Sequence, residues 1–374
     1  MKVAIVHYWF ITRRGGEKVV ESLLKIFPEA DIYTLFYDRK RYGDYLGKHR
    51  VFTSILNKPY LRKHYQKMFP LYPFGLQSLK LKEKYDLIIS SESGPAKGIK
   101  IPEDTPHICY MHTPLRYCYS HRADYIKAMP KLLRQIGNYF LNQLQKWDQQ
   151  TIDNVNLYIA NSVNTANRIK KFYNKPSVVL HPPIADHHFI QKPSAKSKKE
   201  YYLSFGAITP YKRIDILIDA FANTDQKLLI IGEGSERKKL MKKAGNNVTF
   251  TGALPWDQIV KFFEKTKALL FPGEEDFGLI PLEVMAYGIP VIAYKKGGAL
   301  ETVIENRQQP SKSTGTFFKE QSANSVLDAI RYFEEIANQF DRFFIQNHAM
   351  AFRESVFIDK FNTITKQFLK RQNL

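Results

Sequence analysis

The chain has 374 residues, of which 44% are hydrophobic and 14% aromatic, and this composition predicts a globular protein of about two domains. No run reaches the roughly 18 apolar residues of a membrane span, and the two cysteines, Cys109 and Cys118, form neither a disulfide framework nor a metal-binding pair, which suits a reducing cytoplasm. The net charge of +20 implies an anionic partner: nucleic acid, an acidic membrane surface or a phosphorylated substrate.

The predicted elements alternate between short apolar strands and amphipathic helices. Segment 2–9 (KVAIVHYW) lacks a signal-peptide cleavage site and is expected to be a strand, and a helix follows from about Glu17. Further strands are predicted at 85–91, 107–113, 155–162 and 177–184, and then at 201–208, 227–234, 247–254, 268–275 and 290–298. Strands that are apolar throughout are buried on both faces, so they predict parallel sheets covered by helices.

The strands fall into two series, which predicts an α/β protein of two doubly wound domains. The segment 175–198 concentrates Pro, Ser and Lys, the composition of a linker. We therefore expect a first domain over 1–175 and a second over 176–355, with a last helix near 356–374 packing back on the first domain. Ligands of open α/β sheets bind beyond the carboxyl ends of the strands, so the chemistry is expected in a cleft between the domains.

The positive charge is concentrated in two segments that contain no Asp or Glu, 45–82 and 125–147. In both, Lys and Arg are mixed with Leu, Ile, Phe and Tyr, and the second segment also contains Trp147. Such a mixture suits a helix lying on an anionic bilayer, and equally a solvated basic face over an ordinary core helix. Nucleic acid is the less favoured partner, because no helix-turn-helix, zinc-finger or RNA-binding pattern accompanies the charge.

Two features of the first half could bind a ligand. Gly15 and Gly16 stand just before a helix, where bare amide groups and the helix dipole favour an anion, although a glycine pair is often simply a turn. His112 lies at a strand terminus in HTPLRY, where the topology places ligands; its alternative is a structural role.

The second half offers cations and carboxylates. Lys212 and Arg213 follow a strand and precede a helix, a position that suits a diphosphate. In FPGEEDFGLIPLEVMAYG, Glu275 lies in a loop and Glu283 near the start of a helix, and both could accept hydrogen bonds from vicinal hydroxyls of a sugar or ribose. The other two acids, Glu274 and Asp276, are expected to be solvated loop residues.

Together these residues resemble the retaining glycosyltransferases of family 4, which have the GT-B fold of two Rossmann-like domains facing each other across a deep cleft. The resemblance covers nearly the whole chain. It rests on the E-x7-E pair Glu275 and Glu283, on Lys212 in TPYKRID, and on IIGEGSERKKL and GGALETV. The segments RGGEKV, HTPLRY and PYKRID more narrowly resemble GDP-mannose-dependent mannosyltransferases of bacterial O-antigen and exopolysaccharide assembly.

The resemblance implies a role for each matching residue. Glu283 would hold the ribose hydroxyls, Glu275 would contact the transferred sugar, and Lys212 would neutralise the diphosphate. Gly16, beside Gly15, would approach the phosphates from the first domain, and His112 would touch the donor sugar. The amides that would surround the sugar and phosphates belong to Phe277, Gly278, Leu279 and Ile280. No metal or other cofactor is implied, since cationic side chains and helix dipoles take over charge neutralisation.

One position departs from the family pattern. The family usually has an Arg directly after the Gly of the strand before the Lys, and here Ala207 stands there. Arg213 follows Lys212 directly, but neighbours at a helix start point about 100° apart. One phosphate-binding cation is therefore missing, which leaves open a slower enzyme, a repositioned diphosphate or a degenerate family member.

The resemblance implies transfer of a hexose, with mannose from GDP-mannose as the best match, to a lipid-linked or oligosaccharide acceptor in bacterial surface polysaccharide synthesis. The protein would then be cytoplasmic and peripherally associated with the anionic inner face of the plasma membrane, with no nucleic-acid partner. The base would be selected around Gly252, Ala253 and Leu254. The alternatives are a nucleotide-sugar epimerase of GT-B fold and a non-catalytic protein that binds anionic surfaces.

Overall fold

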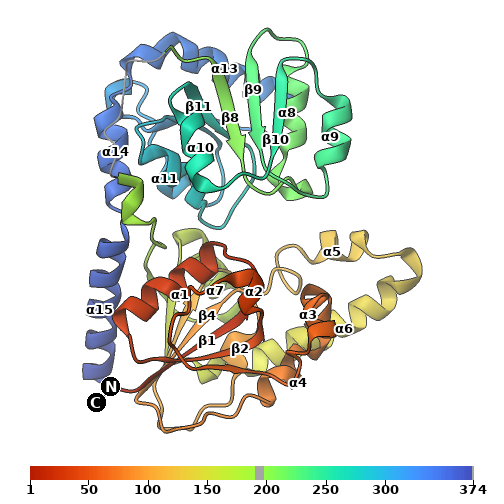
Figure 1. Cartoon of the computed structure of the whole chain (residues 1–374), viewed down its shortest axis with the longest axis vertical. Coiled ribbons are helices and arrows are strands. Elements are labelled where there is room, and N and C mark those ends of the chain that lie inside the picture. The colour runs from red at the N-terminus through yellow and green to blue at the C-terminus, as the bar shows by residue number, and fades with distance from the viewer. Residues whose placement is uncertain (190–197, 373–374) are drawn as a thin grey trace. The chain divides into compact units, whose positions relative to one another are not determined.

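The computed structural model of the chain describes residues 1–189 and 198–372, and it divides into two compact units (Figure 1). Unit 1 comprises Met1–Pro183 and Val356–Leu374, and unit 2 comprises Ile184–Ser355. The predicted division at residue 175 falls short of the end of unit 1, because a short strand at Val178–Val179 pairs with the sheet of that unit. Residues 190–197 of the predicted linker lie outside the described part of the chain.

Unit 1 contains a seven-stranded sheet with the order β3-β2-β1-β4-β5-β6-β7, and its strand pairs are parallel. This is the doubly wound order, in which the chain winds outward in both directions from β1. The strands are β1 (Val3–Phe10), β2 (Asp31–Tyr37), β3 (Val51–Thr53), β4 (Leu87–Glu92), β5 (His107–Met111), β6 (Leu157–Ala160) and β7 (Val178–Val179).

Unit 2 repeats the plan with a six-stranded parallel sheet of order β10-β9-β8-β11-β12-β13. The two predicted parallel sheets are therefore confirmed. The strands are β8 (Tyr201–Phe205), β9 (Lys227–Ile231), β10 (Val248–Gly252), β11 (Thr266–Phe271), β12 (Val291–Tyr294) and β13 (Gly315–Phe318).

Helices cover both sheets (Figure 1). In unit 1 the helices are α1 (Gly15–Ile26), α2 (Arg39–Tyr42), α3 (Pro59–Arg62), α4 (Tyr72–Gln77), α5 (Arg122–Ala128), α6 (Arg134–Gln150) and α7 (Val163–Tyr173), with 3-10 turns η1 (Tyr65–Leu71), η2 (Ala96–Gly98) and η3 (Lys131–Leu133). In unit 2 they are α8 (Ile214–Phe221), α9 (Arg237–Lys243), α10 (Trp256–Phe263), α11 (Leu279–Met285), α12 (Ala299–Thr302), α13 (Ala323–Ile336) and α14 (Arg342–Met350), with the 3-10 turn η6 (Pro210–Lys212) before α8. Within residues 1–189 and 198–372, no helix combines the length and apolar character needed to cross a bilayer.

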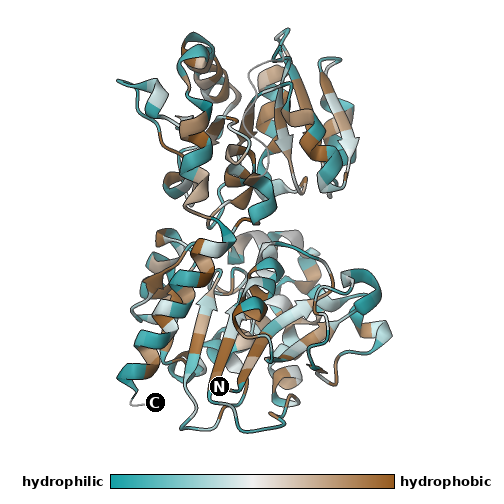
Figure 2. Cartoon of the chain, turned by 60° about the vertical axis from the view of Figure 1, so that its left-hand side comes forward, coloured by the Kyte–Doolittle hydropathy of each residue, from teal (hydrophilic) through white to brown (hydrophobic). Residues whose placement is uncertain are grey.

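The central strands bury both of their faces, as their apolar sequences predict. In β1, Val3 and Ile5 belong to one core cluster and Ala4 and Val6 to another, since successive side chains point to opposite faces of a sheet. Figure 2 shows the hydrophobic residues concentrated in the strands and the hydrophilic residues on the outer faces of the helices. Each sheet therefore carries two apolar layers, and its carboxyl edge is left for ligand-binding loops.

The last helix, α15 (Glu354–Arg371), belongs almost entirely to unit 1. Its buried residues Phe357, Phe361 and Phe368 join the core cluster around β1. The Phe357 ring lies 5.8 Å from Tyr110, and the Phe361 ring lies 6.5 Å from Phe27. Each buried phenylalanine contributes about 1.5–3 kcal/mol of hydrophobic stabilisation, so α15 is an integral part of the first unit rather than a loose tail.

A buried charge network joins η2 to α6. Lys97 and Asp148 are fully buried and form an ion pair. The second carboxylate oxygen of Asp148 accepts hydrogen bonds from Tyr119 Oη at 2.7 Å and Tyr173 Oη at 2.9 Å. Burial raises the pKa of the nearby Glu92 to about 8, which favours its neutral form beside the Lys97–Asp148 pair.

Candidate functional site

The predicted site residues fall into two groups, one in each unit. Gly15, Gly16 and His112 follow strands β1 and β5 of unit 1. The group in unit 2 follows strands β8 and β11 and consists of Lys212, Arg213, Glu275, Phe277, Gly278, Leu279, Ile280 and Glu283. Both groups lie at the carboxyl edge of their own sheet, which is where open α/β sheets bind ligands.

Lys212 and Glu275 are brought together in unit 2. The Lys212 Nζ and Glu275 Oε1 atoms form an ion pair, and the two side chains are 15% and 20% exposed. The Lys212 ammonium also lies 5.5 Å from the centroid of the Tyr211 ring and 6.0 Å from that of Phe271. Both side chains remain partly accessible at the edge of the sheet. When a ligand binds, the lysine can therefore contact an anionic group and the carboxylate a hydroxyl, in place of their contact with each other.

Glycines allow the loop after β11 to approach its neighbours closely. A Cβ at Gly297 would lie 2.3 Å from the Glu275 carbonyl oxygen, and one at Gly298 would lie 2.2 Å from the Phe277 Cα. The Gly298 N–H instead donates a hydrogen bond of 2.8 Å to the Glu275 carbonyl. The Gly-Gly step of GGALETV therefore supports the backbone that carries Glu275.

The same loop leads into α11 through Gly278, whose φ of +84° is a left-handed conformation that favours glycine. The Leu279 and Ile280 amides lie in the first turn, where N–H groups have no intrahelical acceptor, whereas Pro281 has no N–H. Phe277 is buried and anchors the loop in the core. The predicted amide donors are therefore held in a fixed backbone.

Glu283 lies in the second turn of α11 rather than at its start, and its side chain is only 7% exposed. Helix α14 packs against α11 and fixes it, because Gln346 Nε2 donates a hydrogen bond of 2.7 Å to the Ala286 carbonyl. The Glu283 charge contributes to raising the pKa of Tyr287, after the larger effect of burial. This carboxylate is thus buried on a helix that α14 holds in place.

The expectation that both Glu274 and Asp276 are solvated is half wrong. Glu274 is exposed, but Asp276 is only 6% exposed. The difference follows from the anchors on either side of Asp276. The Glu275 carbonyl is bonded to Gly298, and Phe277 is buried, so the residue between them is drawn into the protein.

Arg213 is held by protein groups rather than projecting freely. It adopts a left-handed conformation with φ of +54° before α8. Its guanidinium donates to Asp215 at 3.1 Å and to Gln321 at 3.1 Å, and Gln321 in turn donates to the Pro272 carbonyl at 2.8 Å. Arg213 therefore braces the segment before Gly273.

Ala207 is exposed and lines a small notch with Gly206, Lys212 and Gly273. A Cβ at Gly273 would lie 3.1 Å from the Lys212 Cα, so the two backbones touch. The position that holds an Arg in the resembled family is thus adjacent to Lys212 and opens onto solvent.

In unit 1 the structure places Gly16 against His112. A Cβ at Gly16 would lie 3.0 Å from Tyr8 Oη and 3.5 Å from His112 Nε2, so a larger residue would displace these rings. His112 Nε2 and Ser91 Oγ share a hydrogen bond of 2.9 Å. Burial lowers the pKa of His112 to about 3, so its imidazole is neutral at pH 7 and offers hydrogen bonds rather than positive charge.

Sequence reasoning missed two groups near these residues. In unit 1, His7 Nε2 and Glu17 Oε1 lie 4.0 Å apart behind the Gly16 turn, both fully buried, and neither atom has a hydrogen-bond partner in the described residues. In unit 2, Glu233 lies beside Gly252, whose Cβ would be 3.0 Å from Glu233 Oε1, and Arg237 pairs with Glu233 at 3.4 Å. A polar residue that follows an apolar strand after a single glycine, Gly232, is the signal that could have identified Glu233.

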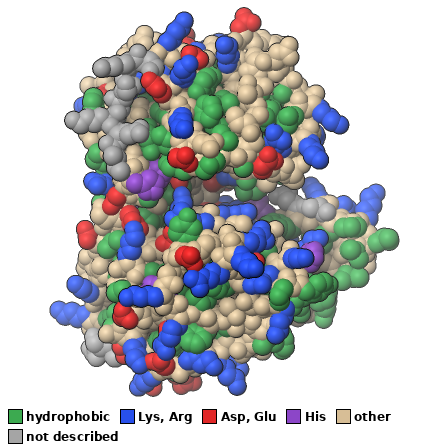
Figure 3. All heavy atoms as spheres, in the orientation of Figure 1, with side chains coloured by type: hydrophobic (Ala, Val, Ile, Leu, Met, Phe, Trp, Pro, Cys, Tyr) green, Lys and Arg blue, Asp and Glu red, His purple; other side chains and the backbone are tan. Residues whose placement is uncertain are grey.

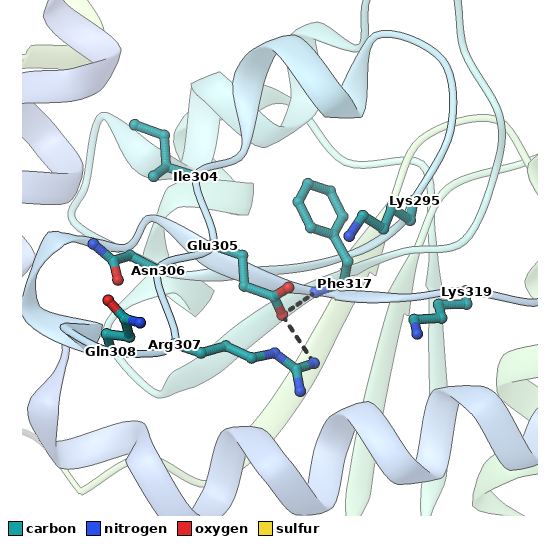
Figure 4. A pocket seen from close by; sticks show the side chains of 8 residues that line it. All are labelled: Lys295, Ile304, Glu305, Asn306, Arg307, Gln308, Phe317 and Lys319. Atoms are coloured by element: carbon teal, nitrogen blue, oxygen red, sulfur yellow. Dashed lines mark hydrogen bonds and ion pairs between the residues drawn. The ribbon is translucent and has the colours of Figure 1, made fainter.

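A separate surface pocket of about 630 Å³ lies at the edge strand β13 (Figure 4). Glu305 accepts hydrogen bonds from the Phe317 N–H at 3.1 Å and from Arg307 at 3.5 Å in its centre. The other residues that line it are Lys295, Ile304, Asn306, Gln308 and Lys319. None of the predicted site residues lines this pocket.

Comparison with known proteins identifies both units. Residues 13–187 match the family model described as Glycosyltransferase Family 4, and residues 185–348 match the model described as Glycosyl transferases group 1. With these two matches the chain is a glycosyltransferase, and the two Rossmann-like domains of the predicted GT-B fold are confirmed.

Several individual proteins are similar to the chain. An uncharacterized glycosyltransferase of Methanocaldococcus jannaschii is 27% identical over 318 residues, 82% of each chain. O-antigen chain mannosyltransferase C of Escherichia coli is 23% identical, with 91% of this chain and 93% of that one covered. A GDP-mannose-dependent alpha-(1-6)-phosphatidylinositol monomannoside mannosyltransferase of Mycobacterium tuberculosis is 28% identical over 40% of this chain and 45% of its own. The solved structure of sucrose-phosphate synthase from Thermosynechococcus elongatus has a TM-score of 0.73 at 16% identity, over 99% of this chain and all of that one.

Proposed function

We propose that the protein transfers a mannosyl residue from GDP-mannose, with retention of configuration, to a lipid-linked or oligosaccharide acceptor in bacterial surface polysaccharide synthesis. The observation that carries this proposal is the pairing of Lys212 with Glu275 at the carboxyl edge of the second sheet, with Glu283 fixed in the helix that follows. The similarity to mannosyltransferases of Escherichia coli and Mycobacterium tuberculosis supports mannose as the sugar and GDP as the nucleotide.

The chemistry requires differential stabilisation of separated charge. As the bond between the sugar C1 and the diphosphate oxygen breaks, positive charge develops on the sugar and negative charge on the leaving group. Lys212 stabilises the negative charge, together with the Leu279 and Ile280 amides. The acceptor hydroxyl attacks C1 from the side of the leaving group, and its proton passes to the departing phosphate oxygen.

The carboxylates bind and orient the donor in this proposal. Once Lys212 is shared with the diphosphate, Glu275 is free to accept hydrogen bonds from hydroxyls of the transferred sugar, and Glu283 accepts them from the ribose. His112 stays a prediction for a sugar contact, and Gly16 stays one for a phosphate contact. The charge neutralisation assigned to Lys212 requires no metal cofactor, which is part of the proposal.

Glu233 provides an argument about the base. Guanine presents an N1–H and a neighbouring amino group, and a carboxylate can accept both hydrogen bonds, whereas uracil presents a single N–H between two carbonyls. Gly252 belongs to the segment that is expected to select the base, and Glu233 lies beside it. The Glu233 side chain is 57% exposed. This placement favours GDP over UDP.

The acceptor is proposed to be carried by the inner face of the plasma membrane. The net charge of +20 and the two acid-free segments, 45–82 and 125–147, suit a surface rich in anionic lipids. No nucleic-acid partner is proposed. The protein would accordingly be cytoplasmic and peripheral to the membrane.

A thermal-shift panel of GDP-, UDP-, dTDP- and ADP-sugars tests the donor. We expect stabilisation by GDP-mannose of about 2.7 kcal/mol at 100 times its dissociation constant, with smaller effects from the other nucleotides. Glu233→Gln should reduce the preference for GDP, whereas Glu200→Gln, at another exposed ion pair of unit 2, should leave it unchanged. Stabilisation by none of the nucleotide sugars would contradict the donor site.

A further inference from the structure

An arm of unit 1 exposes an unusual number of large hydrophobic side chains. The arm comprises α5, η3 and the first half of α6, residues 122–140, and lies to the right in Figure 1. Leu132 is 92% exposed. The other exposed members are Tyr125 (47%), Leu133 (52%), Ile136 (55%), Tyr139 (59%) and Phe140 (41%). An apolar patch of this kind on a soluble unit marks an interaction site.

Helix α6 has two apolar faces rather than one. Gly137, Leu141 and Leu144 are buried at intervals of three and four residues and attach the helix to unit 1. Ile136 and Phe140 lie four residues apart on the adjoining side of α6, which is exposed, and the exposed Leu132 of η3 precedes them at the same interval. The first face accounts for folding, so the second requires another explanation.

Polar contacts hold the arm in shape without the exposed face. Arg122 of α5 donates to Asn142 at 2.6 Å and to Gln145 at 3.1 Å on α6. Arg134 donates to the Lys127 carbonyl at 3.0 Å, and so closes the end of α5. The exposed hydrophobic side chains are therefore presented by a braced structure and are not needed to build it.

The other acid-free segment, 45–82, packs against helix α6, a contact that the sequence did not reveal. Phe69 of η1 packs with Leu141 and Leu144 of α6, and its ring lies 5.8 Å from that of Tyr117. This neighbouring segment also exposes Tyr60 (74%), Leu71 (43%) and Phe74 (57%). Figure 3 shows hydrophobic side chains along the arm with Lys and Arg beside them.

We propose that the arm inserts its exposed apolar face into the headgroup and acyl boundary of an anionic phospholipid bilayer. A bilayer offers both an apolar layer for Leu132 and Ile136 and anionic headgroups for the neighbouring Lys127 and Lys131. A second copy of this chain is the less suitable occupant, because a symmetric contact would oppose two positively charged patches. The inference deepens the proposed function and rests on the membrane-borne acceptor assigned there.

Vesicle flotation of the full chain tests the proposal. We expect binding to vesicles of phosphatidylglycerol and phosphatidylcholine, and weaker binding to phosphatidylcholine alone. Leu132→Glu combined with Ile136→Glu should lower the partition coefficient at least about tenfold, since burying a Leu or Ile side chain favours transfer by that much or more. Lys127→Gln combined with Lys131→Gln should lower binding only to the anionic vesicles and should reduce its salt dependence.

Matched controls separate the arm from general hydrophobicity. Met241→Glu and Phe343→Glu change exposed apolar residues of unit 2 (43% and 57%) and should leave vesicle binding unchanged. Equal binding of the wild type and the Leu132/Ile136 variant, with an unchanged melting temperature, would overturn the proposal. The proposal would also be overturned if the wild type formed a dimer without lipid and the Leu132/Ile136 variant did not, because this face would then be a self-association surface. The flotation assay uses no nucleotide sugar, so it is independent of the thermal-shift panel. Vesicle binding together with no thermal shift from any nucleotide sugar would refute the proposed function and leave this inference standing.

Discussion

Replacing Lys212 by alanine should reduce kcat for mannosyl transfer about 100- to 1,000-fold, with a smaller effect on KM. The expected size is that of losing one preorganised group that stabilises charge developing in a transition state, about 2.7–4 kcal/mol. Lys212 is paired with Glu275 in the free protein, so part of its interaction energy is already used in the ground state. Steady-state kinetics with GDP-mannose measure the effect.

The pairing also predicts non-additivity. Glu275→Ala and the Lys212→Ala, Glu275→Ala double variant should lose activity to a similar extent, because residues that act as one unit do not contribute additively. Lys267→Ala is the matched control, since Lys267 forms a partly buried ion pair with Glu334 at 2.7 Å in the same unit. A Lys212→Ala enzyme with kcat within threefold (about 0.65 kcal/mol) of the wild type would contradict the role given to this lysine.

Replacing Lys97 by methionine should lower the free energy of unfolding by about 3–5 kcal/mol. The substitution keeps the length of the side chain but leaves the charge of Asp148 buried without its cation, and breaking a buried pair in this way has that cost. Tyr119 and Tyr173 keep their hydrogen bonds to Asp148, and these offset only part of the lost stability. Chemical denaturation followed by circular dichroism measures the change.

Lys175→Met provides the control for this prediction. Lys175 pairs with Asp153 at 2.6 Å, but both side chains reach solvent, at 36% and 84% exposure. Exposed ion pairs contribute about 0–1 kcal/mol, so this variant should unfold almost as the wild type does. Similar losses for the two variants would show that the buried network of unit 1 has no special importance.

Much of the fold could be predicted because strand burial leaves a direct mark on the sequence. Runs such as KVAIVHYW and KLLIIGEG are apolar on both faces, and β1 and β9 lie there. Strand β2 (DIYTLFY) and the edge strands β3 and β13 were missed. Two of these are three or four residues long, and β2 mixes Asp and Thr with its apolar residues. Short or mixed segments become strands through pairing with a neighbour, which a local pattern does not encode.

The candidate site divides in a similar way. Lys212 and Glu275 could be singled out by local sequence, but their ion pair joins residues 63 positions apart and depends on how the loops after β8 and β11 fold. The burial of Asp276 depends on Gly298, which packs against this loop from beyond β12. The partners of Arg213 include Gln321, more than a hundred residues away. Contacts across such separations require the tertiary structure.

The surface of the arm at residues 122–140 could likewise not be predicted from the sequence. Its composition suggested either a membrane-binding helix or a basic face over a core helix, and the sequence could not separate these alternatives. Helix α6 packs on the core through one side and exposes apolar residues on another, since Leu141 is 1% exposed and Ile136 is 55% exposed. Only the packing of unit 1 determines which apolar face is covered.

The central claim is retaining transfer of mannose from GDP-mannose, and NMR of the reaction tests it most directly. The protein is incubated with carbon-13-labelled GDP-mannose and octyl α-mannoside, a lipid-like saccharide acceptor, and the product is followed by its anomeric signal. We predict an α-mannoside formed in step with an equal amount of GDP, and no product with the Lys212→Ala, Glu275→Ala double variant. A β-mannoside, or a different free nucleotide sugar without transfer to the acceptor, would contradict the account.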